Sequence, residues 1–363
     1  MTRPLAFVTA EWPASGVGAL TELGFEVATG GWGVTGQALD FAGLVRAAAG
    51  ACVLIVEVET VSDRLLDQLG DVSVVAAARG TPSNVDVAAC TRRRIPVLHT
   101  PGRNAASVAD FVIGLIVSCC RGISAGERRL RSAGWMVDGE VPYRHFRGPE
   151  LAGLTLGLIG FGAVGQRVAA QAAGGLNMRV IHYDPYATGE GAVSVPAGLD
   201  TLLRTADVVS LHCSRSPQTR GLIGAAELAA MKPSSYLINT AGGGIVDETA
   251  LLDALQRGTI AGAALDVFAT EPLPPDSPLL RCERLVLTPH LAGAASDVAA
   301  HHAAIICDDL ARIAAGEPPR HCVNAAEVLP ITPPQQFAVM RASREFREGA
   351  ASRDLPSLAG RTG

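Results

Sequence analysis

A glycine-rich turn between an apolar segment and a helical segment is the feature that most restricts the fold of this chain. The stretch "TLGLIGFGAVGQRVAAQAAGG" begins at residue 155 and contains the pattern Gly-x-Gly-x-x-Gly. In such a turn Gly160 permits the tight bend, Gly162 lets the backbone approach a pyrophosphate, and Gly165 lets the helix pack closely on the strand. The helix N-terminus offers free N–H groups and a positive dipole end to phosphates. The segment therefore predicts a dinucleotide-binding unit.

An acidic residue follows this turn at the distance that dinucleotide sites use. Asp184 ends the segment "RVIHYDP" and lies 19 residues beyond Gly165. A carboxylate at this place accepts hydrogen bonds from the hydroxyls of the adenosine ribose. It also repels a 2′-phosphate, because both groups are negatively charged. The expected cofactor is therefore NAD, in preference to NADP.

Short apolar segments alternate with helical patterns along the whole chain, in two series. Continuous apolar strands separated by helices are typical of parallel sheets that are covered on both faces. Two such series predict two doubly wound α/β domains, and the Gly- and Pro-rich stretch 137–153 is a candidate linker between them. The predicted strands of the first series are 5–10, 25–30, 52–59, 72–78 and 95–101, and those of the second are 155–162, 179–185, 207–213, 235–241, 262–268 and 284–290.

Composition excludes several classes of function. The chain has 363 residues, and its net charge of −5 provides no basic surface for nucleic acid. Its eight cysteines are scattered without a Cys-x-x-Cys pair, so we expect neither a metal site nor a disulfide framework, but reduced thiols in a cytoplasm. The longest apolar run, 111–120, is too short to span a bilayer, and the N-terminus lacks the apolar core of a signal peptide.

A carboxylate and a histidine follow the last two predicted strands. Glu271 lies in the loop after 262–268, and His290 ends the segment "LVLTPH". Ligands of doubly wound sheets sit outside the carboxyl ends of the strands, so both side chains are expected at the cofactor edge. A histidine held by a carboxylate suits proton transfer beside hydride transfer. His290 and Glu271 are therefore the candidate catalytic pair.

Other histidines are given no catalytic role. His182 and His212 stand at strand ends and read as core groups. His301 and His302 stand on a predicted helix and read as surface residues.

Several long motifs resemble one enzyme family. The stretches "ELAGLTLGLIGFGAVGQRVA", "ADVVSLHCSRSPQTRGLIGAAELAAMKPSSYLINTA", "GAALDVFATEPLP" and "LVLTPHLAG" occur in the order found in the D-isomer-specific 2-hydroxyacid dehydrogenases. The resemblance implies a Rossmann NAD-binding domain (103–290) inserted into a split, flavodoxin-like substrate domain (1–102 plus 291–330), followed by a tail (331–363). It also implies a homodimer built around the helix 107–122.

The resemblance assigns roles to individual residues. His290 is the acid/base, Glu271 is its partner, and Asp184 holds the ribose. Asp266 lies on the nicotinamide carboxamide. The remaining cofactor contacts are Gly160, Gly162, Ala163, Val164 and Gly165 at the pyrophosphate, Cys213, Ser214 and Thr219 at the adenosine, and Thr240 and Ala241 near the nicotinamide. The substrate loop is Arg79, Gly80 and Thr81.

Three stretches depart from the family pattern. The family has Asn-Thr-Ala-Arg-Gly-Gly after the strand 235–241, whereas this chain reads "NTAGGG", with Gly242 in the place of the arginine. That arginine polarises the substrate oxo group and holds the substrate carboxylate. The substrate loop has Thr81 and Pro82 where many members have a glycine-centred turn, and it presents Arg79. The stretch "HCSRSPQT" replaces the family's Pro-Leu-Thr with Ser214, Arg215 and Ser216. Either arginine could restore a cation, or both could be solvated surface residues.

Three functions are consistent with these motifs. The first is an NAD-dependent oxidoreductase acting on a small, atypical hydroxy or oxo acid through His290. The second is a catalytically inactive NAD-binding sensor or scaffold. The third is an enzyme that uses bound NAD for an internal redox step.

Overall fold

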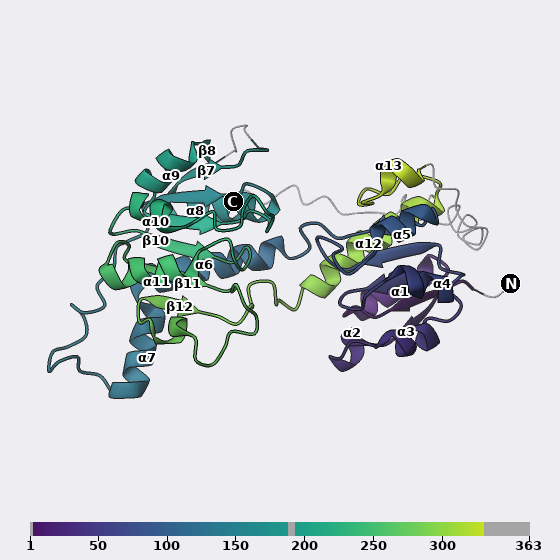
Figure 1. Ribbon diagram of the computed structural model, residues 1–363, viewed down its shortest axis with the longest axis horizontal. Coiled ribbons are helices and arrows are strands. Elements are labelled where there is room, and N and C mark those ends of the chain that lie inside the picture. Colours follow the sequence, from purple (N-terminus) through teal and green to yellow (C-terminus); the bar gives the residue numbers. More distant parts are fainter. Residues whose placement is uncertain (1–2, 188–192, 330–363) are drawn as a thin grey trace, which may run out of the picture. The chain divides into compact units, whose positions relative to one another are not determined.

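The computed structural model describes residues 3–187 and 193–329, and the expected tail 331–363 lies outside them. The chain forms two compact units. One contains the residues up to Arg103 together with those from Ser296 onward, and the other contains Asn104–Ala295 (Figure 1). The chain therefore enters the second unit once and returns once. These crossings differ from the expected domain bounds by one residue at the first and five at the second.

The first unit is built on a five-stranded parallel sheet of order β2-β1-β3-β4-β5, which is the flavodoxin-like order. All six residues of the central strand β3 are buried, because apolar clusters pack on both faces of the sheet. The strands are β1 Leu5–Val8, β2 Glu26–Thr29, β3 Ala51–Val56, β4 Val74–Ala77 and β5 Val97–Leu98. The helices are α1 Ala14–Glu22, α2 Trp32–Thr35, α3 Phe41–Ala47, α4 Asp63–Gln68, α5 Val87–Arg92, α12 Val298–Ala314 and α13 Ala325–Val328.

The second unit holds a seven-stranded parallel sheet of order β12-β11-β10-β9-β6-β7-β8 (Figure 1). The order reverses between β6 and β9, which makes this the topological switch point of a Rossmann-type sheet. The strands are β6 Thr155–Ile159, β7 Arg179–Tyr183, β8 Val195–Pro196, β9 Val208–Leu211, β10 Tyr236–Asn239, β11 Gly262–Leu265 and β12 Leu285–Leu287. The helices are α6 Ala105–Arg121, α7 Ile123–Ala133, α8 Ala163–Leu176, α9 Leu199–Thr205, α10 Ala225–Ala230, α11 Glu248–Arg257 and the 3₁₀ turn η1 Pro278–Arg281.

The two parallel sheets confirm the predicted fold class. Each of the eleven predicted strands corresponds to a strand of the structure, and only the two-residue edge strand β8 was not predicted. Both residues of β8 are exposed, so no continuous apolar run marks this strand in the sequence.

The apolar helix α6 is a core element of its own unit. It packs against α8 and against β10 and β11, and its buried residues join the apolar cluster on that face of the sheet. Within the described residues no single helix is long and apolar enough to cross a membrane. The pair α6 and α7 meets those two criteria together, with a bend of 62° between them.

Two expectations from the sequence are wrong. The stretch 137–153 lies inside the second unit, after α7, and does not link the units. Its glycines and prolines mark an irregular loop, and composition alone does not distinguish such a loop from a domain boundary. His302 is buried and not a surface residue. Its Nε2–H donates to the Glu11 carbonyl at 2.6 Å, its Nδ1 accepts from Arg103 at 3.0 Å, and its ring stacks on Trp12.

Candidate active site

The glycine-rich turn after β6 has the geometry that close backbone approach requires. Gly160 adopts a left-handed φ of +97°, and a Cβ atom there would lie 2.5 Å from the backbone nitrogen of Cys213. A Cβ at Gly165 would lie 2.4 Å from the Gly160 carbonyl oxygen. In contrast, a Cβ at Gly162 would meet no atom within 4 Å. The first and third glycines are therefore required by packing, while the second faces open space at the N-terminus of α8.

Asp184 lies beside this turn. Its Oδ2 accepts a hydrogen bond from the Phe161 N–H at 2.8 Å, and its Oδ1 accepts from the Tyr186 N–H at 2.8 Å. Partial burial acts to raise the pKa of this carboxyl, but the backbone N–H groups outweigh that effect and hold the pKa below its ordinary value. The structure thus brings an ionised carboxylate and the glycine turn together at the switch point.

The loop after β9 carries three of the expected adenosine contacts and is closed by its own hydrogen bonds. Thr219 Oγ1 donates to the Ser214 carbonyl at 2.8 Å and accepts from the Ser216 N–H at 2.8 Å. Cys213 is half-buried, and burial raises the pKa of its thiol. This loop lies beside the glycine turn, because the His212 N–H donates to the Ile159 carbonyl at 2.7 Å.

The turn after β10 holds the expected nicotinamide contacts Thr240 and Ala241. Asn239 fixes it, because its Oδ1 accepts from the Ala241 N–H at 3.0 Å and its Nδ2 donates to the Gly242 carbonyl at 3.1 Å. Thr240 Oγ1 is buried and has no hydrogen-bond partner among the described residues. A buried hydroxyl without a hydrogen-bond partner is costly. A polar group of a bound ligand would supply the missing partner here.

The three glycines that follow differ in what the fold demands of them. A Cβ at Gly243 would lie 1.7 Å from the Phe268 carbonyl oxygen, and Gly244 has a left-handed φ of +80°. Both positions therefore need glycine. Gly242 does not, because a Cβ there would lie 3.3 Å from Arg215 Cβ and 3.4 Å from Ile245 Cδ1, and small side-chain shifts would admit it.

Asp266 holds the loop that carries His290. Its fully buried carboxylate accepts hydrogen bonds from the Thr288 hydroxyl at 2.6 Å and from the backbone N–H groups of Leu291 and Ala292, each at 2.8 Å. The register of β11 and β12, which aligns Leu265 with Leu287, places these groups side by side. Because both oxygens already accept hydrogen bonds within the chain, the carboxylate acts first as an organiser of this loop.

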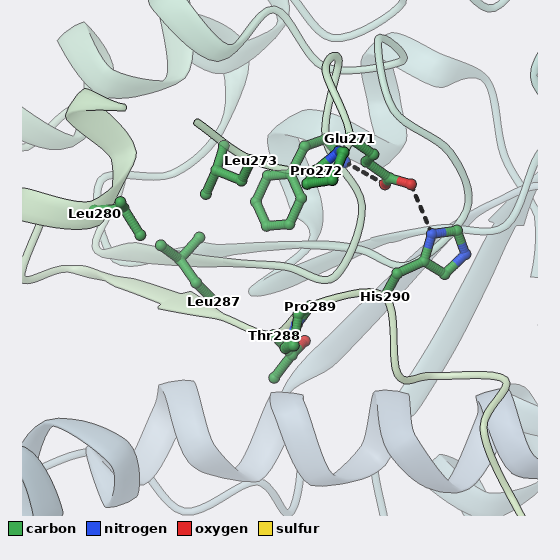
Figure 2. Close-up of a pocket in the computed structure, with 9 residues that line it drawn as sticks. Glu271, Pro272, Leu273, Leu280, Leu287, Thr288, Pro289 and His290 are labelled. Atoms are coloured by element: carbon green, nitrogen blue, oxygen red, sulfur yellow. Dashed lines mark hydrogen bonds and ion pairs between the residues drawn. The ribbon is translucent and has the colours of Figure 1, made fainter. Parts of the chain in front are cut away.

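His290 and Glu271 form a hydrogen-bonded pair (Figure 2). His290 Nδ1 lies 2.8 Å from Glu271 Oε2. A carboxylate only accepts, so Nδ1 carries the proton in this bond and Nε2 is left for other partners. His290 has a left-handed φ of +55°, and its N–H donates to the Asp266 carbonyl at 2.9 Å. This conformation is uncommon for a residue other than glycine and is held by the surrounding hydrogen bonds.

Glu271 is fixed from its other side. Its Oε1 accepts from the Phe268 N–H at 2.9 Å. Partial burial acts to raise the pKa of this carboxyl. The hydrogen bonds from His290 and Phe268, with the charges of His290 and Arg215, outweigh burial and hold the pKa below its ordinary value. Glu271 is therefore ionised near neutral pH and orients the imidazole.

Two pockets meet at this pair. One, of about 410 Å³, is lined by Arg215, Glu271, His290 and residues of the loops after β10 and β11. The other, of about 680 Å³, is mostly apolar and includes Pro272, Leu273, Leu280 and Leu287. Figure 2 shows the apolar residues on one side of the pair and Nε2 of His290 directed away from them. No group of the described residues hydrogen-bonds to Nε2 of His290, which lies at the carboxyl edge of the sheet.

The expected substrate-loop residues Arg79, Gly80 and Thr81 belong to the first unit. Arg79 Nη1 donates to the Glu57 carbonyl at 3.4 Å, and the Arg79 carbonyl accepts from the Thr100 N–H at 2.9 Å. The Gly80 carbonyl lies 2.8 Å from His99 Nδ1. Their part in substrate binding stays a prediction.

Two features of the site were missed at the level of sequence. The organising role of Asp266 depends on the pairing of β11 with β12, which no local pattern specifies. Arg215 lies against Gly242 because the loops after β9 and β10 are adjacent. The Ser-Arg-Ser replacement in "HCSRSPQT" was the one signal that pointed to Arg215.

A Rossmann-type sheet with a glycine turn, a carboxylate beside that turn and a Glu–His pair at its edge is typical of dinucleotide-dependent oxidoreductases. Comparison with known proteins agrees. Residues 113–292 match the D-isomer specific 2-hydroxyacid dehydrogenase, NAD binding domain. The chain belongs to the D-isomer specific 2-hydroxyacid dehydrogenase family.

Two relatives and one solved structure are similar over most of their lengths. YoaD of Bacillus subtilis, named as a 2-hydroxyacid dehydrogenase, is 39% identical over 82% of this chain and 88% of its own. The (S)-sulfolactate dehydrogenase of Chromohalobacter salexigens is 42% identical over 70% of this chain and 82% of its own. An NAD-complexed D-isomer specific 2-hydroxyacid dehydrogenase of Lactobacillus delbrueckii is 26% identical, covers 89% of this chain and 100% of its own, and superposes with a TM-score of 0.75.

We predict that Asp266→Asn destabilises the loop that carries His290. An amide offers one acceptor oxygen where the carboxylate offers two, and it turns an N–H group toward a backbone donor. The free energy of unfolding should fall by about 2–4 kcal/mol, measured by chemical denaturation. Asp253→Asn is the control, because its carboxylate pairs with Arg257 on the exposed face of α11 and should change stability by less than about 1 kcal/mol. Equal stability of the two variants would contradict the role of Asp266.

Proposed function

We propose that this protein is an NAD-dependent oxidoreductase that interconverts a small 2-oxo acid and the corresponding 2-hydroxy acid. The observation that carries the proposal is the His290–Glu271 pair, with Nδ1 held at 2.8 Å by a carboxylate and Nε2 free at the edge of the sheet. Both ring nitrogens of the buried residue His302 are, in contrast, engaged within the fold.

The residues around the glycine turn fit a dinucleotide. Gly162 leaves room for a pyrophosphate at the N-terminus of α8, Asp184 would accept the ribose hydroxyls, and the hydroxyl of Thr240 would find a partner. A bound nicotinamide cofactor would supply the hydride to C2 of the oxo acid, or accept it from the hydroxy acid. The charge of Asp184 supports NAD over NADP, because it would face a 2′-phosphate.

His290 would move the proton. In the direction of reduction, Nε2–H donates its proton to the substrate oxygen as C2 gains the hydride, and the product is the 2-hydroxy acid. Glu271 keeps the ring oriented and stabilises the imidazolium before the transfer. In the direction of oxidation, the neutral ring accepts the hydroxyl proton.

The substrate is expected to be atypical because position 242 has no side chain. The family pattern has an arginine there, and an arginine binds a carboxylate through two parallel hydrogen bonds. The inactive sensor and the internal redox enzyme are separate possibilities for such a site. The ordered Glu271–His290 pair favours the oxidoreductase, because a sensor needs only the cofactor contacts.

Replacing the acid/base tests the proposal directly. We predict that His290→Ala lowers kcat for reduction of a 2-oxo acid by about 10²–10⁴-fold, measured by NADH absorbance, while NAD affinity is unchanged in calorimetry. His301→Ala should behave as the wild type, because His301 is an exposed histidine of the first unit. Equal rates for wild type and His290→Ala would support the sensor instead.

Cofactor preference is tested at Asp184. We predict that NADH binds more tightly than NADPH, since the carboxylate repels the 2′-phosphate. Asp184→Asn removes the charge and should narrow the difference in affinity, although it keeps only one of the two oxygens that accept from the Phe161 and Tyr186 N–H groups. Titration calorimetry with both cofactors measures this. Tighter binding of NADPH to the wild type would overturn the preference.

We also propose a homodimer with α6, or the segment beside it, at the interface. The segment after α6 exposes several apolar side chains, namely Ile123, Leu130, Trp135, Met136, Val141 and Tyr143. Such a collection on one segment is typical of a protein–protein interface.

Light scattering should therefore give twice the chain mass of 37.4 kDa at micromolar concentration. Leu130→Glu should shift the mass toward the monomer. Val195→Glu, at an exposed position on β8, should not. A monomeric wild type would refute the assembly.

A further inference from the structure

An arginine from the neighbouring loop covers the place where position 242 lacks a side chain. A Cβ at Gly242 would lie 3.3 Å from Arg215 Cβ and 3.9 Å from Arg215 Cδ. The aliphatic stem of Arg215 therefore runs across Gly242. The β9 and β10 strands are adjacent in the sheet, so their loops meet at the same carboxyl edge. A large side chain at position 242 and the present path of Arg215 exclude each other.

The guanidinium of Arg215 is available to a ligand. Within residues 3–187 and 193–329 no side chain forms a hydrogen bond or ion pair with it. Arg215 nevertheless lines the 410 Å³ pocket together with Glu271 and His290. Its charge also contributes to the lowered pKa of Glu271, as expected for a cation that faces the pair. A solvated surface arginine would extend away from such a pocket.

The backbone beneath Arg215 is held in place. Thr219 Oγ1 donates to the Ser214 carbonyl and accepts from the Ser216 N–H, each at 2.8 Å. Both neighbours of Arg215 are thus tied to one side chain. A cation on a closed loop retains its direction better than one on a free loop, which matters for recognition of a planar carboxylate.

We propose that Arg215 binds the carboxylate of the 2-oxo acid and stabilises the negative charge that develops on the substrate oxygen. It does so from the loop after β9, in place of an arginine at position 242. Gly242 is the complementary half of the arrangement, because its missing side chain makes room for the stem of Arg215. This inference rests on the proposed oxidoreductase function and names the cation which that function requires.

The test uses the full chain. Glyoxylate is the substrate to be reduced by NADH, and oxamate is a binding probe that is not turned over. Arg215→Ala should lower kcat/KM for glyoxylate by about 10²–10³-fold. It should weaken oxamate binding to the NADH-loaded protein by roughly tenfold or more, while NADH affinity stays unchanged. Arg215→Lys retains the charge but not the paired donors, so its loss should be intermediate.

A relocation series asks whether the two positions exclude each other. Gly242→Arg alone should crowd the stem of Arg215 and fail to raise activity. The double variant Arg215→Ala with Gly242→Arg should recover part of the oxamate affinity lost in Arg215→Ala. Arg220→Ala is the matched control, since Arg220 is an exposed arginine of the same loop that is absent from the pocket; it should behave as the wild type.

The outcomes separate the two proposals. If Arg215→Ala binds oxamate and reduces glyoxylate as the wild type does, Arg215 is not the substrate cation, although the oxidoreductase stands. If the wild type neither binds oxamate nor reduces glyoxylate, Arg215 does not hold the carboxylate of a 2-oxo acid and the present proposal fails. If His290→Ala retains the wild-type rate, the proposed function fails and Arg215 fails with it. Thermal unfolding checks that each variant is folded. Arg215→Lys, which changes an exposed side chain, keeps the test decisive if the Gly242→Arg variants do not fold.

Discussion

The buried carboxylate of Asp266 is the interaction on which the geometry of the site depends. It accepts hydrogen bonds from the Thr288 hydroxyl and from the N–H groups of Leu291 and Ala292, and its backbone carbonyl accepts from the His290 N–H. Those bonds hold His290 in a left-handed conformation that costs about 1 kcal/mol or more in isolation. The backbone conformation already places the imidazole of His290 at the edge of the sheet, so Glu271 needs only to orient the ring.

The same edge collects the other functional groups through the order of the strands. All described strands of the second sheet run parallel, so the turns after β6, β9, β10 and β11 all emerge on one side. The close contact between Gly160 and the backbone at Cys213 brings the first two of these turns together. Each loop thus contributes one part: the glycine turn, a cation, a buried hydroxyl, and the carboxylates that hold the histidine.

The three glycines at positions 242–244 differ in the structural constraint that acts on each of them. At position 243 a backbone carbonyl oxygen leaves no room for a Cβ, and at position 244 the backbone has a left-handed φ. At position 242 neither constraint applies, so the backbone fold does not require a glycine there. The aliphatic stem of Arg215, from the neighbouring loop, lies where a side chain at position 242 would extend.

The sequence by itself determined the elements and the identity of most candidate groups. Local patterns suffice for this, since a buried strand needs a continuous apolar run and the glycine turn needs its spacing. The tertiary structure decided how the groups are coupled. Asp266 became an organiser because β11 pairs with β12 in one register, and His302 became a core residue because Trp12 and Arg103 cover it. Arg215 came to lie on Gly242 because β9 and β10 are neighbours in the sheet. Such contacts are set by the pairing and packing of separate segments, and no local pattern encodes them.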